Sequence, residues 1–199
     1  MSSRVQPKPA KSNLPKYIMW ATIAIVIVVI AIVLHEQSKN QIVSNAASTA
    51  QVTSKLKTGD TAPEFQASTN AGPFDLASVS TPVLVEVFAT WCPHCQKETS
   101  VLSDLAKNYA GKVQFVAVSG SANGMDGNSP ESQADVMQFG QTFHVGYPIA
   151  FDPNLDVAQK YVKSGFPTIA IIGKDKKIHY LQDGEQSEQA LSKALNSVI

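Results

Sequence analysis

The chain contains only two cysteines, Cys92 and Cys95, and they follow closely on a continuous apolar run at Val83–Ala89. A structural disulfide normally joins distant segments, because its stabilising effect grows with the length of the loop that it closes. The loop between these two cysteines is too short to gain much from that effect. We therefore interpret the pair as a reversible redox site, placed where a buried strand ends and a helix begins.

A helix is expected to start at Cys92, because Pro93 suits the first helical position, where its missing N–H costs nothing. Gly111 is expected to end this helix, and a second buried strand is predicted at Val113–Val118. Within the predicted helix, apolar side chains recur at helical spacing at Val101, Leu102, Leu105, Ala106 and Tyr109.

The rest of the chain alternates helical and extended patterns. We predict a loop at Ser119–Asn128, a helix that begins at Ser129-Pro130-Glu131 and reaches Phe143, a shorter helix from Asp152-Pro153 through Tyr161, a hairpin of Thr168–Ile172 with Lys177–Leu181, and a closing helix capped by Ser187. Strands that alternate with helices predict an α/β fold, in which helices cover a sheet through right-handed crossovers.

The run Tyr17–Leu34 is apolar and uncharged over 18 residues, which at about 1.5 Å per residue is long enough to cross a bilayer. The preceding residues are basic without an acid, so we expect a cytoplasmic N-terminus and an extracytoplasmic C-terminal part. A signal peptide cleaved near Ala46–Ala50 is the alternative. The predicted parts are a cytoplasmic tail at 1–16, a transmembrane helix at 17–34, a flexible linker at 35–56 and one domain at 57–199.

The charge balance excludes one class of partner. After residue 40 the chain has 11 Lys and Arg residues against 15 Asp and Glu residues, a net charge of about −4. Nothing in this part of the sequence resembles the basic surface of a nucleic-acid-binding protein. We therefore expect no nucleic-acid partner.

Two motifs together resemble the thioredoxin superfamily: Trp91-Cys92-Pro93-His94-Cys95 at a strand-to-helix junction, and Gly165-Phe166-Pro167-Thr168 before the last hairpin. The lead-in Gly59–Phe65 is similar to that of the membrane-anchored extracytoplasmic TlpA/ResA/CcmG-like branch. This resemblance implies a thioredoxin-like fold, a central mixed sheet flanked by helices. It also implies an N-terminal hairpin within residues 60–76 and a helical insert within 120–160.

The expected chemistry follows from the position of the two thiols. At the N-cap of a helix, Cys92 faces unpaired N–H groups that favour its thiolate, so we expect it to be the exposed nucleophile. Cys95, one turn deeper, is the resolving thiol that closes the disulfide. Pro93 and His94 are expected to tune the potential, because a charged imidazole beside the thiolate makes the disulfide a stronger oxidant. An alternative for His94 is a solvated histidine without effect.

Two carboxyl groups are candidate proton carriers. Glu86 is the only charge in the first buried strand, and it occupies the place of the buried acid of thioredoxins, which suits general acid/base work on Cys95. Its alternative is a carboxylate that reaches solvent at a sheet edge. Glu98 matches the glutamate of the ResA-like Trp-Cys-x-x-Cys-x-x-Glu pattern. Its alternative is an ordinary solvated helix residue.

Three further residues are expected to contact substrate. Resemblance to the thioredoxin cis-proline loop implies a cis bond before Pro167, which leaves the backbone of Phe166 facing the dithiol, where a substrate segment can add as a strand. Phe166 departs from the smaller or β-branched residue usual in the family. Trp91 is expected to form a lid beside the sulfur, with plain core packing as the alternative.

These features predict a membrane-tethered, extracytoplasmic thiol–disulfide oxidoreductase that exchanges the Cys92–Cys95 disulfide with protein substrates. Cys-Pro-His-Cys is the dipeptide motif of DsbA-like oxidases and slightly favours an oxidase, whereas the TlpA/ResA branch is mostly reducing and includes cytochrome c maturation. The implied membrane partner is a DsbB/VKOR-like oxidase or a CcdA/DsbD-like reductase. No metal and no cofactor besides the redox-active disulfide are expected. A copper-handling thioredoxin-like protein is a further alternative.

Overall fold

The computed structural model describes residues 55–199, together with Val26 and residues 28–30, which are helical. The predicted tail at 1–16 and most of the predicted span at 17–34 and linker at 35–56 lie outside these described residues. Within the part of the chain that the structure describes, no helix has the length and apolar character needed to cross a bilayer.

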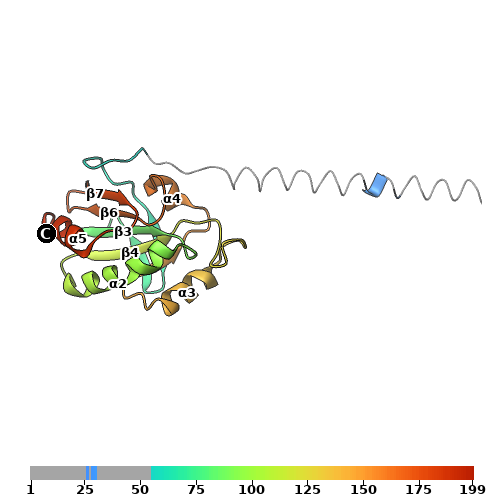
Figure 1. Ribbon diagram of the computed structural model, residues 1–199. Helices are drawn as coiled ribbons and strands as arrows, with labels where there is room; N and C mark the ends of the chain where they lie inside the picture. The colour runs from blue at the N-terminus through green and yellow to red at the C-terminus, as the bar shows by residue number, and fades with distance from the viewer. Residues whose placement is uncertain (1–25, 27, 31–54) are drawn as a thin grey trace, which may run out of the picture. The chain divides into compact units, whose positions relative to one another are not determined.

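The described domain is built on one mixed sheet in the order β2-β1-β5-β4-β3-β6-β7 (Figure 1). The strand β3 is parallel to β4 and antiparallel to β6, and β5 joins the sheet parallel to β4. The two hairpins β1–β2 and β6–β7 close the sheet at either side. The first lies within 60–76, as the family resemblance implies, and the second is the last hairpin that the sequence pattern predicts. The strands are β1 Gln66–Thr69, β2 Gly72–Asp75, β3 Val83–Phe88, β4 Gln114–Ser119, β5 Ile149–Phe151, β6 Thr168–Ile172 and β7 Ile178–Asp183.

Helices pack on both faces of the sheet (Figure 1). Alternate side chains of β3 point to opposite faces: Val85 and Val87 join the cluster that contains α4, whereas Leu84 and Phe88 join the cluster that contains α2, α3 and α5. Every residue of β3 is buried, which is why its sequence is apolar throughout except at Glu86. The helices are α2 Pro93–Asn108, α3 Gln133–Thr142, α4 Asp156–Tyr161 and α5 Glu188–Asn196.

The predicted starts of α2 and α5 are confirmed. Cys92 is the N-cap of α2 with Pro93 as the first helical residue, and Ser187 caps α5 by accepting a hydrogen bond from the N–H of Ala190. The helix α2 ends at Asn108, before Gly111, which adopts a left-handed φ of 74° beyond it. The α/β layering is therefore as the periodicity predicts.

The predicted start of α3 at Ser129 is wrong, because the helix is capped three residues later. The Ser132 hydroxyl accepts from the N–H of Asp135 at 3.3 Å, and the Asp135 carboxylate accepts from the N–H of Ser132 at 2.8 Å. This reciprocal capping box satisfies two backbone donors at once, so it defines the start of the helix. Pro130 instead pairs with Asn123 in an isolated bridge within the preceding loop.

The helix α4 also starts later than predicted. Asp152 does not begin it but accepts hydrogen bonds from the N–H groups of Asp156 at 3.0 Å and Val157 at 2.7 Å, which caps the helix from outside. The N-cap residue itself is Leu155, in a left-handed conformation with φ 58°. The short strand β5, which was not predicted from the sequence pattern, ends at Phe151, directly before this cap.

The two serines before α3 give a direct test of its start. Replacing Ser132 with Ala is expected to lower the free energy of unfolding by about 1 kcal/mol, because the N–H of Asp135 loses its acceptor. Replacing Ser129 with Ala is the matched control and should change it by less than about 0.5 kcal/mol. Urea unfolding of the full chain measures both, and equal losses for the two variants would contradict the observed cap.

Candidate active site

Cys92 is presented by the turn between β3 and α2. The N–H of Cys92 donates to the carbonyl of Ala89 at 3.1 Å, so the chain turns sharply after β3. The sulfur of Cys92 then accepts from the N–H of Cys95 at 3.4 Å, as an N-cap oxygen would. Both cysteines are free thiols in this structure.

The two thiols have opposite acidities. The pKa of Cys92 is lowered to about 6, first by its hydrogen bond with the Cys95 thiol, then by the backbone N–H groups of Cys95 and His94, against the opposing effect of burial. The pKa of Cys95 is strongly raised, first by burial, then by the hydrogen bond with Cys92 and by the nearby charge of Glu86. At neutral pH the thiolate therefore belongs to Cys92, in line with a nucleophile and a resolving thiol.

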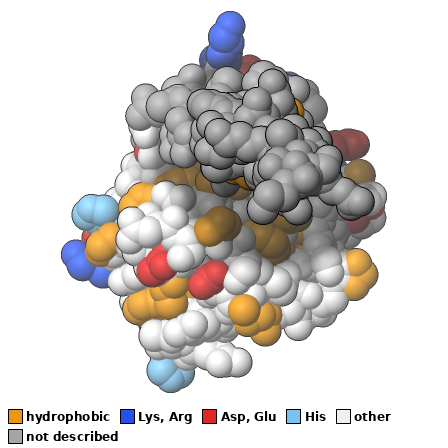
Figure 2. Space-filling model, turned by 90° about the vertical axis from the view of Figure 1, so that its right-hand side faces the viewer, with side chains coloured by type: hydrophobic (Ala, Val, Ile, Leu, Met, Phe, Trp, Pro, Cys, Tyr) orange, Lys and Arg blue, Asp and Glu red, His pale blue; other side chains and the backbone are white. Residues whose placement is uncertain are grey.

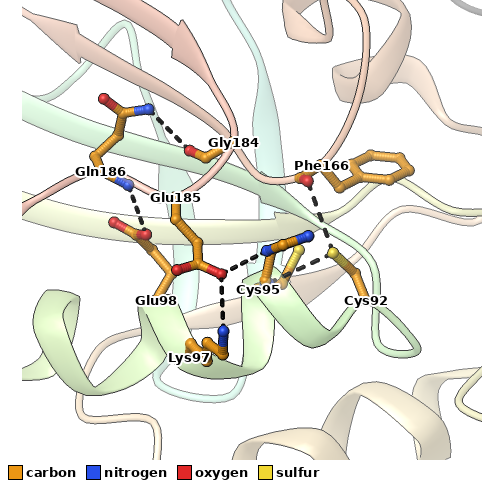
Figure 3. Close-up of polar contacts among 9 residues, drawn as sticks. Cys92, Cys95, Lys97, Glu98, Phe166, Gly184, Glu185 and Gln186 are labelled. Atoms are coloured by element: carbon orange, nitrogen blue, oxygen red, sulfur yellow. Dashed lines mark hydrogen bonds and ion pairs between the residues drawn. The ribbon is translucent and has the colours of Figure 1, made fainter.

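The expectation that Cys92 is exposed needs correction. Its residue is only 4% exposed, while Cys95 is fully buried. The Cys92 sulfur lies 3.7 Å from the carbonyl oxygen of Phe166, to which it donates when protonated, because the loop before β6 lies against it (Figure 3). The Phe166–Pro167 bond is cis, as predicted. A substrate must therefore approach the sulfur alongside this loop.

Trp91 is a surface residue, not a core residue. It is 40% exposed, so the core-packing alternative is wrong. Its ring meets the ring of Phe166 edge to face at 6.3 Å, and its indole N–H donates to the Ser121 hydroxyl at 2.8 Å. Trp91 and Phe166 thus form an aromatic pair next to the nucleophile. Figure 2 shows apolar side chains spread among polar ones on the side of the molecule that it presents.

Glu86 is a buried acid beneath the dithiol. It is 1% exposed in β3, between β4 and β6, so the sheet-edge alternative is wrong. Because side chains alternate along a strand, Glu86 shares the face of Leu84 and Phe88, which α2 covers. The Tyr147 hydroxyl donates to its Oε2 at 2.9 Å. Burial raises the pKa of Glu86 to about 8, although the Tyr147 hydrogen bond lowers it in part.

Glu98 is a second buried acid, and it lies on the same side of α2 as Cys95, three residues away. It is 2% exposed, so the solvated-residue alternative is wrong. Its Oε2 accepts from the N–H of Gln186 at 2.9 Å (Figure 3). Burial raises its pKa to about 7. Among the described residues, Oε1 of Glu86 and Oε1 of Glu98 have no hydrogen-bond partner.

His94 is exposed and is bound away from the sulfur. Its Nδ1 lies 2.5 Å from Oε1 of Glu185, which comes from the loop between β7 and α5, and Lys97 Nζ lies 3.4 Å from the same oxygen. The hydrogen bonds of the Cys92 sulfur go to Cys95 and Phe166 (Figure 3). The imidazole charge near Cys92 is the weakest cause of its low pKa.

Three residues of this region were not predicted from the sequence. Tyr147 and Glu185 contact Glu86 and His94 from 61 and 91 positions away, which no local pattern reveals. Glu131, interpreted as a first-turn helix acid, instead accepts hydrogen bonds from Thr90 and Ser119 below the active-site turn. For Glu131, the Ser132-x-x-Asp135 capping box was the available signal that the helix starts after it.

The donors that could hold a metal ion at this site are the two sulfurs. Among residues 55–199 and the few helical residues described before them, no group of three His, Cys, Asp or Glu side chains is arranged to bind a metal. A two-sulfur site is incomplete for the usual tetrahedral zinc geometry. The arrangement of one acidic thiol, one buried thiol and buried carboxyls suits thiol–disulfide exchange.

Two bacterial proteins are similar to this chain in sequence. The chain is 26% identical over 145 residues to the thioredoxin-like protein YneN of Bacillus subtilis, covering 71% of this chain and 80% of that protein. It is 26% identical over 117 residues to the thiol-disulfide oxidoreductase ResA of Bacillus thuringiensis, covering 58% of this chain and 62% of that protein.

The fold is shared with a solved structure, the thioredoxin domain of a thiol-disulfide oxidoreductase from Bacteroides vulgatus. The TM-score is 0.61 at 19% identity, over 73% of this chain and 100% of that one. The sequence profile of the Redoxin family matches residues 57–198, a stretch that includes both cysteines, both buried acids and the cis-proline loop. The chain therefore belongs to the Redoxin family, with ResA-like thiol-disulfide oxidoreductases among its relatives.

Proposed function

We propose that this protein is a thiol–disulfide oxidoreductase that reduces disulfides of protein substrates, outside the cytoplasm and tethered to the membrane. The observation that carries the proposal is the pair of thiols with opposite acidity, Cys92 at the helix N-cap and Cys95 above a buried carboxyl group. Such a pair performs a two-electron exchange without any other cofactor.

The exchange proceeds in two balanced steps. The Cys92 thiolate attacks one sulfur of a substrate disulfide, which forms a mixed disulfide and releases the other substrate sulfur as a thiolate that takes a proton from water. Glu86, with a pKa of about 8, is mostly protonated at neutral pH, and its ionised fraction then accepts the Cys95 proton. The resulting Cys95 thiolate attacks the Cys92 sulfur. The second substrate thiolate leaves and is protonated, so the substrate gains two electrons and two protons while the Cys92–Cys95 disulfide forms.

The Phe166 loop is the proposed contact for the substrate chain. The Phe166 carbonyl oxygen lies 3.7 Å from the Cys92 sulfur, so a substrate strand that pairs with this backbone would bring its own sulfur beside Cys92. The ring pair of Trp91 and Phe166 adds apolar contact area next to that strand. These features favour an extended, partly apolar protein segment as substrate.

The direction of electron flow depends on how strongly the Cys92 thiolate is stabilised, because a more stable thiolate makes the disulfide a stronger oxidant. His94, the residue that favours the oxidase prediction, is paired with Glu185 instead of the sulfur. The buried Glu86 opposes a negative charge at Cys95. Both observations support a reductase. The ResA relatives agree with it, and cytochrome c maturation is one process in which such a reductase acts.

An oxidase is the second candidate, and the low pKa of Cys92 favours it. The two candidates require different membrane partners: an electron-conducting CcdA/DsbD-like reductase for the first, and a DsbB/VKOR-like oxidase for the second. The copper-handling alternative also stays a prediction, which metal analysis of the reduced protein tests. One bound copper ion per protein molecule would favour the copper-handling function over the reductase and the oxidase.

The location is part of the proposal. The apolar run at 17–34 would act as a single-pass anchor, with the N-terminus in the cytoplasm and the domain at 57–199 outside. Accessibility of Lys residues in the domain to an impermeant label on intact cells tests this topology. Labelling only after the cells are broken would contradict it.

The acidity of Cys92 predicts its reactivity. In the full chain, the rate of Cys92 alkylation by iodoacetamide should reach half its maximum near pH 6, because the thiolate is the reacting form. The Cys95→Ala variant should have a higher midpoint, since it removes the Cys95 thiol, the main group that lowers this pKa. A midpoint near the ordinary value of about 8.5 would remove the basis of the proposal.

The raised pKa of Glu86 leads us to expect that this residue lowers folding stability while it promotes thiol–disulfide exchange. Its pKa rises to about 8 in the folded state from 4.5, so the folded state holds more protons than the unfolded state between these values and stability falls as pH rises through them. Glu86→Gln removes this loss, so its gain in unfolding free energy should grow from pH 5 to pH 8, reaching about 2 kcal/mol or more.

The same variant should slow exchange with a protein disulfide by about tenfold or more, because Cys95 loses its proton acceptor. Denaturation at pH 5, 7 and 8, together with insulin reduction, measures both effects. A variant that is stabilised but exchanges at the wild-type rate would show that Glu86 is not the proton acceptor.

The Cys92–Cys95 reduction potential in a glutathione series decides the direction. We expect a reducing potential, and a fall of less than about 30 mV for His94→Ser, which corresponds to less than a tenfold change in the equilibrium constant. Glu185 accounts for this small effect, since it already binds the imidazole. A much larger fall would show that His94 controls the thiolate, and the oxidase would then be the better assignment.

A further inference from the structure

The proposed exchange leaves one buried carboxyl group without a role. Glu131 is 9% exposed and lies in the loop between β4 and α3, defined here as the insert loop, residues 120–131. Its Oε1 accepts from the Thr90 hydroxyl at 2.9 Å, and its Oε2 accepts a hydrogen bond from the Ser119 hydroxyl. Its own N–H donates to the carbonyl of Ala122 at 3.0 Å, which ties it into the loop.

Thr90 connects this carboxyl group to the nucleophile. It is fully buried and stands two residues before Cys92, in the turn between β3 and α2. Its hydroxyl is held by Glu131, and its carbonyl accepts from the Gln96 amide at 3.2 Å. The turn is therefore fixed on one side by α2 and on the other by the insert loop.

The insert loop contacts two more parts of the site. Ser121 accepts the hydrogen bond of the Trp91 indole and donates its own hydroxyl to Asn123 at 2.8 Å. Gly120 lies under the Phe166 ring, and a Cβ at Gly120 would come within 3.3 Å of that ring and 2.5 Å of Val87. Thr90, Trp91 and Phe166 thus all lie against this one loop.

Burying the Glu131 carboxyl group is energetically costly, which suggests that this residue has a functional role. Burial opposes ionisation of Glu131 and raises its pKa, although the two hydroxyl groups lower it in part. Replacing a buried, hydrogen-bonded charge by apolar residues is often neutral or stabilising, so general stability does not explain it. What the carboxyl group provides is geometry, because it joins the insert loop to the active-site turn at a defined position.

We propose that Glu131 is a positioning residue for the redox site, which acts through Thr90 to hold Trp91 and Cys92 in place for a protein substrate. This inference rests on the proposed exchange function and adds a residue to it. Through its hydrogen bond with Thr90, Glu131 fixes the position of the turn that carries Cys92. Its hydrogen bond with Ser119 only anchors the carboxyl group to the end of β4.

Matched variants separate these two contacts. Thr90→Val keeps the shape of the side chain and removes the hydroxyl donor, while Ser119→Ala removes the other donor. Each leaves one oxygen of Glu131 unpaired, so both should lose stability to a similar extent. Only Thr90→Val and Glu131→Ala should lower kcat/KM for insulin reduction by about tenfold, because small displacements of reacting groups are costly.

A second readout distinguishes positioning from simple loss of structure. In Thr90→Val and Glu131→Ala the midpoint of Cys92 alkylation should move to higher pH, because the sulfur shifts away from the N–H of Cys95. In Ser119→Ala the midpoint and kcat/KM should stay within about twofold of wild type. Glu131→Gln, whose amide can accept from Thr90 and donate to Ser119, should retain most of the activity.

The double variant Thr90→Val/Glu131→Ala should be no worse than Glu131→Ala alone, since both remove the same contact. The proposal is overturned if Thr90→Val matches Ser119→Ala in kinetics and alkylation, or if the two substitutions are additive. These outcomes differ from failure of the proposed function, in which the wild-type protein itself would not reduce insulin.

Discussion

The site depends on one interaction, the hydrogen bond from the N–H of Cys95 to the sulfur of Cys92 at the start of α2. The strand β3 brings the chain to this point, and Pro93 starts the helix there. Proline suits this position because it lacks a backbone N–H, which would have no partner within the helix. The helix then places Cys95 one turn deeper, against the sheet. One short segment thus gives two identical side chains opposite acidities. Cys92 receives hydrogen bonds from the Cys95 thiol and from backbone N–H groups, whereas Cys95 is buried and lies near a carboxyl group.

The layer between β3 and α2 contains unusual polar groups for a protein interior. Glu86 and Glu98 are both buried there, and each leaves one oxygen without a partner among the residues described. A buried carboxyl group without full hydrogen bonding is costly and tends to stay protonated at neutral pH. The burial of these groups therefore lowers stability, in keeping with the proton-acceptor role proposed for Glu86.

Three loops from distant parts of the chain complete the site. The Phe166 loop touches the sulfur, the insert loop holds Thr90 and Trp91, and the loop after β7 holds His94 through Glu185. The contact between His94 and Glu185 weakens the argument that the Cys-Pro-His-Cys motif indicates an oxidase. A histidine between the cysteines favours an oxidant through the charge that it places near the sulfur. Here a surface carboxylate binds the imidazole, and its charge is the weakest cause of the low pKa of Cys92.

Local patterns in the sequence determined β3, the start of α2 at Cys92, the last hairpin and the cap at Ser187, because periodicity, proline and capping residues act within a few positions. The first hairpin was expected only from the family resemblance. They also identified Glu86 as a buried acid, since a strand that is apolar on both sides of a single charge carries that charge into the core. The start of α3 was misjudged because Ser129-Pro130-Glu131 and Ser132-x-x-Asp135 are both plausible caps, and only the tertiary position of Glu131 separates them. Tertiary structure alone decided the burial of Cys92 and the partners of His94, Glu86 and Thr90, because these contacts join residues tens of positions apart, and chain folding, not local preference, brings them together.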